Sequence, residues 1–202
     1  MRQLETLKNN LLSLGYTVNC FEQADEATAY LCEKLQGSSV GFAGSMSLEK
    51  MGLYEQLSKT ATVYWHHRIP EGKTSREVRT QANAAPVYIT SVNAVAESGE
   101  IVNIDANCNR VASIFYGHDK VYFVIGKNKI TKTYDDAVYR ARNIAAPLNA
   151  KRLGVNTPCA VKADRCYDCK SPQRICRGLS VLWAPPMTGE FEILLINEDL
   201  GY

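Results

Sequence analysis

Residues 86–110, PVYITSVNAVAESGEIVNIDANCNR, decide the fold that the sequence predicts. The segment begins with an apolar strand from Val87 to Thr90 and continues through a turn of small and polar residues at Glu97-Ser98-Gly99. A second strand, Glu100 to Ile104, follows and ends on polar groups. This order places a carboxylate just beyond a buried strand, where open α/β sheets hold their ligands. We therefore expect Glu97 to be a catalytic residue.

Strand and helix patterns alternate on both sides of this segment. Leucines 4, 7, 11 and 14 form the stripe of an amphipathic helix, and Gly15 ends it. The continuous apolar run Val121 to Ile125 is typical of a strand in the middle of a sheet. A long helix is expected from Asp135 or Asp136, and Pro147 should kink it or end it early.

The remaining predicted elements continue the alternation. They are strands at 16–20, 39–43, 62–65, 180–183 and 192–196, and helices capped by Asp25, by Ser47 and by Thr74 with Glu77, with a short helix at 109–115. The pattern predicts an α/β fold with three α/β/α layers and a mainly parallel sheet. Neighbouring strands within 86–104 and 180–196 allow antiparallel edges.

Composition and charge exclude several classes of protein. The 202 residues are 46% hydrophobic and 22% charged, as in an ordinary soluble globular protein. Residues 151–180 hold seven Lys and Arg against two Asp, which leaves the rest of the chain at −3. A local basic patch of this kind argues against a nucleic-acid partner. The start of the sequence lacks the apolar core of a signal peptide, and no apolar run approaches the ~18 residues of a membrane span, so we expect a cytoplasmic protein.

The sequence divides into three parts. We expect an α/β core over 1–154, a cysteine-rich basic insertion over 155–178, and closing strands of the same domain over 179–202.

A loop of small residues, Gly41-Phe42-Ala43-Gly44-Ser45-Met46-Ser47-Leu48, joins a strand to a helix. Its N–H groups and hydroxyls suit a phosphate or carboxylate, so Gly44, Ser45 and Ser47 are candidate ligand-binding residues. The alternative is a simple turn in which Ser47 caps the helix.

Polar residues after the two central strands extend this candidate site. A carboxylate such as Glu97 can act as a nucleophile or a general base, although Glu-Ser-Gly is also ordinary turn chemistry. The candidates for lining the same hollow are Asn93, Asp105, Asn109 and, as the partner of an anion, Arg110. Asn and Asp are equally common at caps and turns.

Two further groups of residues could carry chemistry. Cys159, Cys166, Cys169 and Cys176 cluster in the basic segment, where they could hold zinc or an iron–sulfur cluster, act as a reversible dithiol, or remain four free thiols. The other three cysteines are scattered and fit a reducing compartment. His66 and His67 follow a strand, where histidines are usually structural.

Several of these motifs, in this order, resemble the LUD, or lactate-utilisation, domain family. They are Gly44 to Glu49, Ser91 to Asp105, Asn109 to Ala112 and Arg142 to Ala150, and the four-cysteine stretch and the closing Glu198 to Tyr202 are similar to a stand-alone bacterial subgroup. The resemblance implies a fold like that of sugar-phosphate isomerases and coenzyme A transferases. It also implies a cytoplasmic role in oxidising lactate to pyruvate, with a small anionic metabolite and iron–sulfur oxidoreductase subunits as partners.

The resemblance assigns roles to two loops. Gly44 to Ser47 matches where relatives in that superfamily hold a phosphate or coenzyme A, and Glu97-Ser98-Gly99 looks like the turn that carries a nucleophilic Glu in coenzyme A transferases. At Ala106 and Cys108 the chain lacks glycines that we associate with this family. We therefore expect a protein that binds a small organic anion; the alternatives are a transferase- or isomerase-like enzyme using Glu97, or a metal or iron–sulfur redox module.

Overall fold

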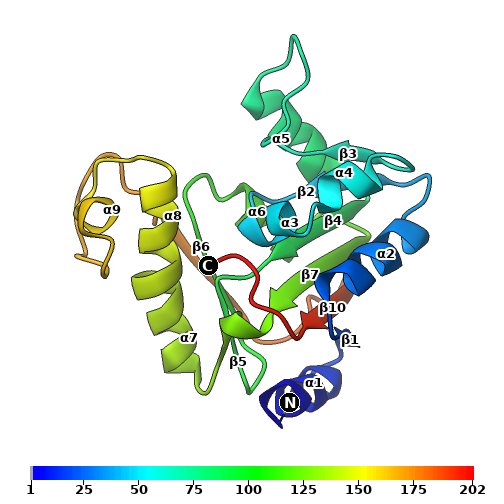
Figure 1. Cartoon of the computed structure of the whole chain (residues 1–202), viewed down its shortest axis with the longest axis horizontal. Coiled ribbons are helices and arrows are strands. Elements are labelled where there is room, and N and C mark those ends of the chain that lie inside the picture. The colour runs from blue at the N-terminus through cyan, green and yellow to red at the C-terminus, as the bar shows by residue number, and fades with distance from the viewer. Residues whose placement is uncertain (1) are drawn as a thin grey trace.

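The computed structural model describes residues 2–202, so residue 1 of the core expected over 1–154 lies outside the described residues. Six parallel strands form its main sheet (Figure 1). Their order is β1-β10-β7-β4-β2-β3. The strands are β1 (Thr17–Phe21), β10 (Glu190–Ile196), β7 (Lys120–Gly126), β4 (Val87–Ser91), β2 (Ser39–Phe42) and β3 (Thr62–Tyr64). The predicted α/β class is confirmed, as is the position of the apolar run 121–125 near the centre of the sheet.

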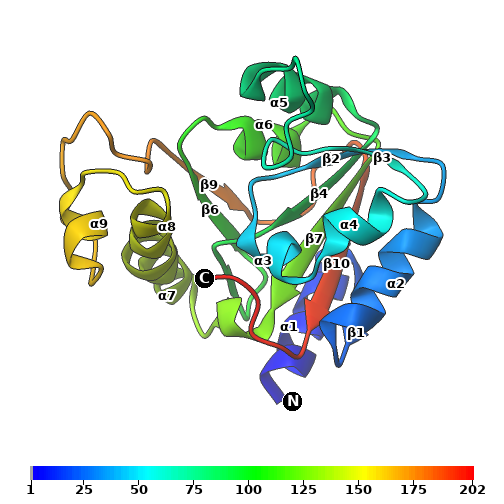
Figure 2. The ribbon, with the colours of Figure 1, turned by 45° about the horizontal axis from the view of Figure 1, so that its top comes forward.

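Helices cover both faces of this sheet (Figure 2). Helices α2 (Ala24–Lys34), α3 (Met46–Lys50) and α4 (Leu53–Leu57) pack on one face, and α1 (Arg2–Ser13), α5 (Ser75–Ala84) and α6 (Asn109–Phe115) on the other. In β7, Phe123 contacts the second group of helices and Val124 the first, because successive side chains of a strand point to opposite faces. The side chains on both faces of the sheet are apolar, and the helices packed on them bury the sheet.

A second, four-stranded sheet corrects the expected topology. It is ordered β8 (Ile130–Thr131), β5 (Ala94–Ala96), β6 (Ile101–Asp105) and β9 (Gly178–Leu182), and it contains the antiparallel pairs β5–β6 and β6–β9. The antiparallel strands therefore lie in this second sheet and not at the edges of the main sheet. Strand β10, which was expected to allow such an edge, is an inner parallel strand of the main sheet. Asn93 marks the point at which the chain leaves β4 for this sheet, since its Oδ1 accepts the N–H of Ile104 at 2.7 Å.

The long helix after residue 133 is interrupted before Pro147, as predicted. It consists of α7 (Tyr134–Arg140), a π-helical turn (Ala141–Ala145) and α8 (Ala146–Arg152). Proline has no N–H to donate to the preceding turn, and a π-turn is one way in which a helix accommodates a break in its ladder. Ala137 and Ala141 pack against the second sheet, which gives the molecule a further layer.

Helix caps agree with the sequence in one case and differ in three. Thr74 and Glu77 form the expected capping box of α5. The residues before α2 and α7 are Gln23 and Thr133 rather than Asp25 and the expected Asp135 or Asp136. Ser45, not Ser47, caps α3, because the Ser47 hydroxyl is used in the interior of the protein.

Residues 155–178 contain a single short helix, α9 (Pro158–Lys162). The chain then continues without helix or strand to β9. None of the helices within residues 2–202 has the length and apolar character that crossing a bilayer requires.

Replacing Leu194 with Ala should lower the free energy of unfolding by about 2–5 kcal/mol, because this fully buried side chain lies in the inner strand β10. Urea unfolding measures the change. Leu12→Ala, at a position that is 46% exposed on α1, is the control and should cost less than about 1 kcal/mol. Equal losses in the two variants would contradict the position of β10.

Candidate functional site

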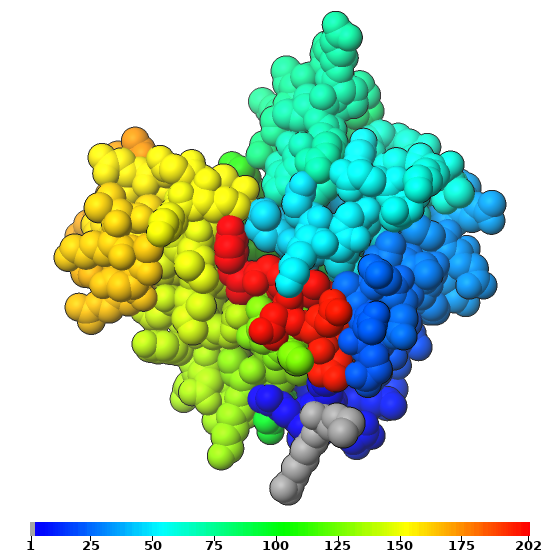
Figure 3. All heavy atoms as spheres, viewed as in Figure 1, coloured from blue at the N-terminus to red at the C-terminus, as the bar shows by residue number. Residues whose placement is uncertain are grey.

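A crevice opens beside the carboxyl ends of β2, β3 and β4, between the main sheet and α8. It consists of a cavity of about 340 Å³ and a smaller one of about 80 Å³. The two cavities share the wall residues Gly44, Asn93, Asp105, Arg110, Asn149 and Arg152. On the surface, the C-terminal residues lie between the segments around α3 and α8 (Figure 3). The position agrees with the rule that open parallel sheets bind ligands beyond the strand ends.

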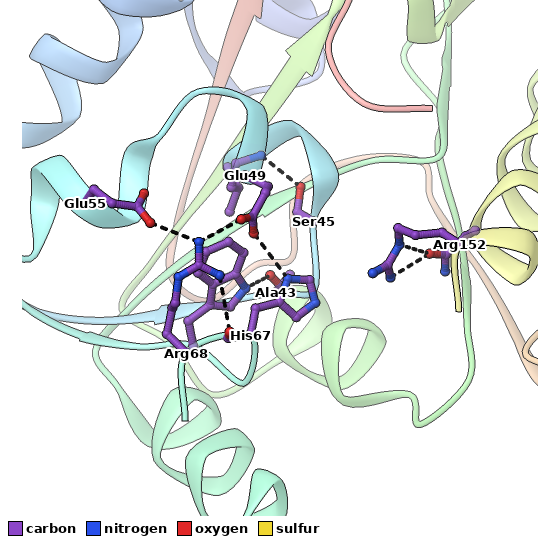
Figure 4. Close-up of polar contacts among 10 residues, drawn as sticks. Ala43, Ser45, Glu49, Glu55, His67, Arg68 and Arg152 are labelled. Carbon is purple, nitrogen blue, oxygen red and sulfur yellow. Dashed lines mark hydrogen bonds and ion pairs between the residues drawn. The ribbon is translucent and has the colours of Figure 1, made fainter. Parts of the chain in front are cut away.

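A tight turn after β3 carries His66 and His67 into this crevice. The N–H of Arg68 donates to the Trp65 carbonyl at 2.8 Å, which closes the turn around the two histidines. The Trp65 indole Nε1 donates to the Ala43 carbonyl at 2.9 Å and so ties the turn to the end of β2. Arg68 also donates to Glu49 at 2.7 Å (Figure 4). The histidines are therefore held on a rigid support.

Gly44 lets the histidine rings approach the backbone closely. A Cβ atom at this position would lie 3.0 Å from His66 Nε2 and 3.4 Å from His67 Nε2. Such contacts are tighter than side chains normally make, so any larger residue would displace the rings. Gly44, which the sequence suggested as a ligand-binding residue, is thus needed for the close approach of the two imidazole rings.

Both histidines are held in their neutral form. Burial lowers the pKa of His66 to about 4, and the nearby Arg79 guanidinium lowers it further. Burial and Arg152 also lower the pKa of His67, although Glu49, 3.6 Å from its Nδ1, opposes the shift. A neutral imidazole has one donor and one acceptor nitrogen, and His66 Nδ1 has no hydrogen-bond partner within the described residues.

The walls of the crevice are rich in cations. Arg79 extends from α5, Arg110 from α6 and Arg152 from α8. Arg152 faces His67 across the crevice (Figure 4), and within residues 2–202 its side-chain hydrogen bonds go to Asn149. Arg110 is buried and pairs with Asp105 at 2.7 Å. Asp105 is the one acidic residue among the described residues that line the crevice.

Lys129 lies at the bottom of the smaller cavity and is almost completely buried. Its Nζ is 2.9 Å from each of three acceptors, the hydroxyls of Ser47 and Ser91 and the carbonyl of Val92. Burial lowers the pKa of this amine well below its usual range, and the neighbouring Arg140 and Arg110 lower it further. Burial thus favours the uncharged form of the amine.

The structure brings most of the predicted ligand-binding residues together. Those that line the crevice are Gly44, Ser45, Asn93, Asp105, Asn109 and Arg110. Ser47 lies beneath it, where its hydroxyl bonds to Ser91, Leu200 and Lys129.

Glu97 does not line the crevice, so the expected hollow shared with Ser45 is not formed. The turn packs against α1 instead: Asn10 donates to the Glu97 carbonyl, and a Cβ at Gly99 would meet Leu14. The cause is the second sheet, whose hairpin carries residue 97 away from the strand ends.

Sequence reasoning missed Arg79, Lys129, Asn149 and Arg152 as site residues. Lys129 carried a signal, because it follows the most apolar strand of the chain at the end where ligands bind. Arg152 was counted only as part of a basic segment. Arg79 and Asn149 lie on ordinary amphipathic helices, and nothing in their spacing marks them.

A family model describing the LUD domain matches residues 4–196. The chain belongs to the LUD-domain family. Among solved structures it is similar to a DUF162 family protein from Deinococcus radiodurans, with 13% sequence identity over 96% of each chain and a TM-score of 0.56. At this identity the likeness shows the fold alone. No curated protein matches the chain.

The four clustered cysteines of this LUD domain line one small cavity behind α8. Cys159, Cys166, Cys169 and Cys176 are free thiols and share a pocket of about 10 Å³ with Arg142 and Arg174. As they stand, no three His, Cys, Asp or Glu side chains within residues 2–202 are placed to hold a metal ion. The structure thus shows clustered thiols, and a metal or cluster remains a prediction.

NMR titration of the LUD domain should find that His66 protonates with a pKa of about 4. Its folded pKa lies below the unfolded value, so this group makes the protein less stable as pH falls from about 6.5 towards 4. Arg79→Gln should raise the pKa of His66, because it removes a neighbouring positive charge. Arg76→Gln, an exposed arginine on the same helix, is the control and should leave it unchanged. An ordinary pKa near 6.5 would contradict the buried, cationic setting.

Proposed function

We propose that this LUD-domain protein binds a small organic anion of the lactate or pyruvate type in the crevice and acts in organic-acid metabolism. The supporting observation is the charge of the walls. Arg79, Arg110 and Arg152 line the crevice, while among the described wall residues the only acidic side chain is that of Asp105. A carboxylate ligand would supply the missing negative charge.

The pairing of each cation supports this proposal. Asp105 is used by Arg110, and no carboxylate within residues 2–202 forms a salt bridge with Arg79, Arg152 or Lys129. Arginine binds carboxylates through paired N–H groups. Arg152 is the best placed of these residues, because it lines both cavities and reaches the crevice from outside the sheet.

The neutral histidines fit a ligand with a second polar group beside its carboxylate. A neutral imidazole can donate to a keto oxygen or accept from a hydroxyl. A 2-hydroxy or 2-oxo acid offers one of these groups next to its carboxylate. A cavity of about 340 Å³ lies at the small end of the usual range for ligand sites.

Arg152→Gln should weaken binding of lactate or pyruvate by about 10- to 100-fold, because it removes one charge-assisted hydrogen bond worth about 1.5–3 kcal/mol. Isothermal titration calorimetry measures the affinity. Lys151→Gln is the matched control, since Lys151 is the exposed neighbour on the same helix and does not line the crevice.

Sugar phosphates and coenzyme A thioesters belong in the same titrations as competing ligand classes. Tighter binding of either would move the proposal to that class of anion. An equal loss of affinity in both variants would mean that net charge alone attracts the ligand. No stabilisation by any of these anions would contradict an anion site in the crevice.

The setting of Lys129 favours a second candidate function, an enzyme that acts on a 2-oxo acid through an imine. Two serine hydroxyls contact the buried amine, and they could carry protons to and from it. The uncharged amine would attack the carbonyl carbon, a C=N bond would form, and the carbonyl oxygen would leave as water. Such chemistry requires an unprotonated lysine, which the burial of Lys129 favours.

Incubation with pyruvate and borohydride should fix the imine as a stable amine on Lys129. Peptide mass spectrometry locates the adduct. Lys129→Arg should abolish it, whereas Lys127→Arg, at an exposed lysine two residues away, should not. Labelling spread over surface lysines would contradict a reactive Lys129 and would leave the anion site itself unaffected.

Three sequence-based expectations remain predictions. The first is a transferase- or isomerase-like role for Glu97, which the crevice does not support because Glu97 does not line it. The others are the iron–sulfur oxidoreductase partners and the cytoplasmic location.

A further inference from the structure

We propose that Cys159, Cys166, Cys169 and Cys176 bind a thiophilic metal centre, either a zinc ion or an iron–sulfur cluster. The two share one chemistry, because each is held by four cysteine thiolates. This site is separate from the proposed anion function and does not depend on it.

All four thiols line one cavity. Cys159 lies on α9, and the other three lie in the following loop, yet the four line the same small cavity. No disulfide joins any of these four cysteines. Four free thiols around one cavity supply the type and number of ligands that a tetrahedral zinc ion or an iron–sulfur cluster uses.

Hydrogen-bond donors lie next to two of the sulfurs. The backbone N–H of Asp168 donates to Cys166 Sγ at 3.3 Å, within the Cys166-x-x-Cys169 turn. Arg174 donates to Cys176 Sγ at 3.4 Å, and Arg142 lines the same cavity. Donors and positive charge next to sulfur stabilise the charged ligand that metals bind.

Hydrophobic burial gives this loop little support, since none of residues 161–179 is fully buried. A stretch of this length without helix or strand normally needs another means of support. Asp168 also has a positive φ of 46°, which is uncommon for a residue other than glycine. A metal cross-link would supply the support, as it does in small domains that lack a core.

The thiols would have to move closer together to bind the metal, since no metal site exists among the described residues as they stand. The absence of fully buried residues in 161–179 makes that movement inexpensive, because it would disrupt no core packing. The cavity walls formed by Pro147 and Ala150 belong to α8 and can stay in place.

Anaerobic purification of the whole chain, followed by elemental analysis and visible absorption, tests the proposal. Zinc in proportion to the chain, without colour, would identify a zinc site. Iron with acid-labile sulfide, and visible absorption that bleaches on reduction, would identify a cluster. Cys166→Ser and Cys169→Ser should each lose most of the bound metal.

Cys20→Ser and Cys32→Ser are the matched controls, because these cysteines lie on β1 and α2, outside the cavity. They should keep the full metal content. Circular dichroism shows whether each variant is folded. Retention of the metal in folded Cys166→Ser and Cys169→Ser variants would overturn the proposal. Absence of metal after both anaerobic purification and reconstitution with zinc or with iron and sulfide would also overturn it.

Discussion

The buried amino group of Lys129 joins the ends of the central strands, and the shape of the crevice depends on it. Lys129 follows β7, and its three acceptors come from the start of α3 after β2 and from the end of β4. Ser47 extends the network to the carbonyl of Leu200 beyond β10. Four neighbouring parallel strands are thus tied together at their carboxyl ends. Each bond holds a polar group that would otherwise be costly to bury.

This network contains no carboxylate side chain, which distinguishes it from an ordinary buried ion pair. A buried cation is normally stable only when it is paired or loses its charge. Lys129 contacts hydroxyls and a carbonyl, and Arg140 beside it donates to the main-chain oxygens of Asn128, Asn93 and Tyr202. Burying Lys129 and Arg140 without a carboxylate side chain therefore costs electrostatic free energy. This cost arises at the strand ends, beside the smaller cavity and its arginines. An anionic ligand would relieve that cost, which ties stability and binding to the same charges.

Periodicity predicted the layers of the fold, but it could not predict the second sheet or the full site. The apolar run 121–125 and the leucine stripe of α1 identify buried elements because burial repeats with the geometry of the strand and the helix. The separation of β5 from β4 depends on Asn93, whose side chain bonds to Ile104, eleven residues away. Contacts of this kind leave no local pattern. Gly44 was found because it lies in a loop of small residues after a strand, and Arg110 because polar residues cluster after β6. Arg79 lies on a helix without such a signal, and Glu97 was expected in a hollow that it does not line.

Helix α8 separates the crevice from the cysteine cavity and presents a different side to each. Asn149 and Arg152, three residues apart, line the crevice, while Pro147 and Ala150, also three apart, line the cysteine cavity. Residues at this spacing share one face of a helix. Ala146 contributes to both walls, and Ile175 from the loop does the same. The π-turn before Pro147 sets the rotation of α8, so a feature that looked in the sequence like a simple helix break determines which side chains reach each site.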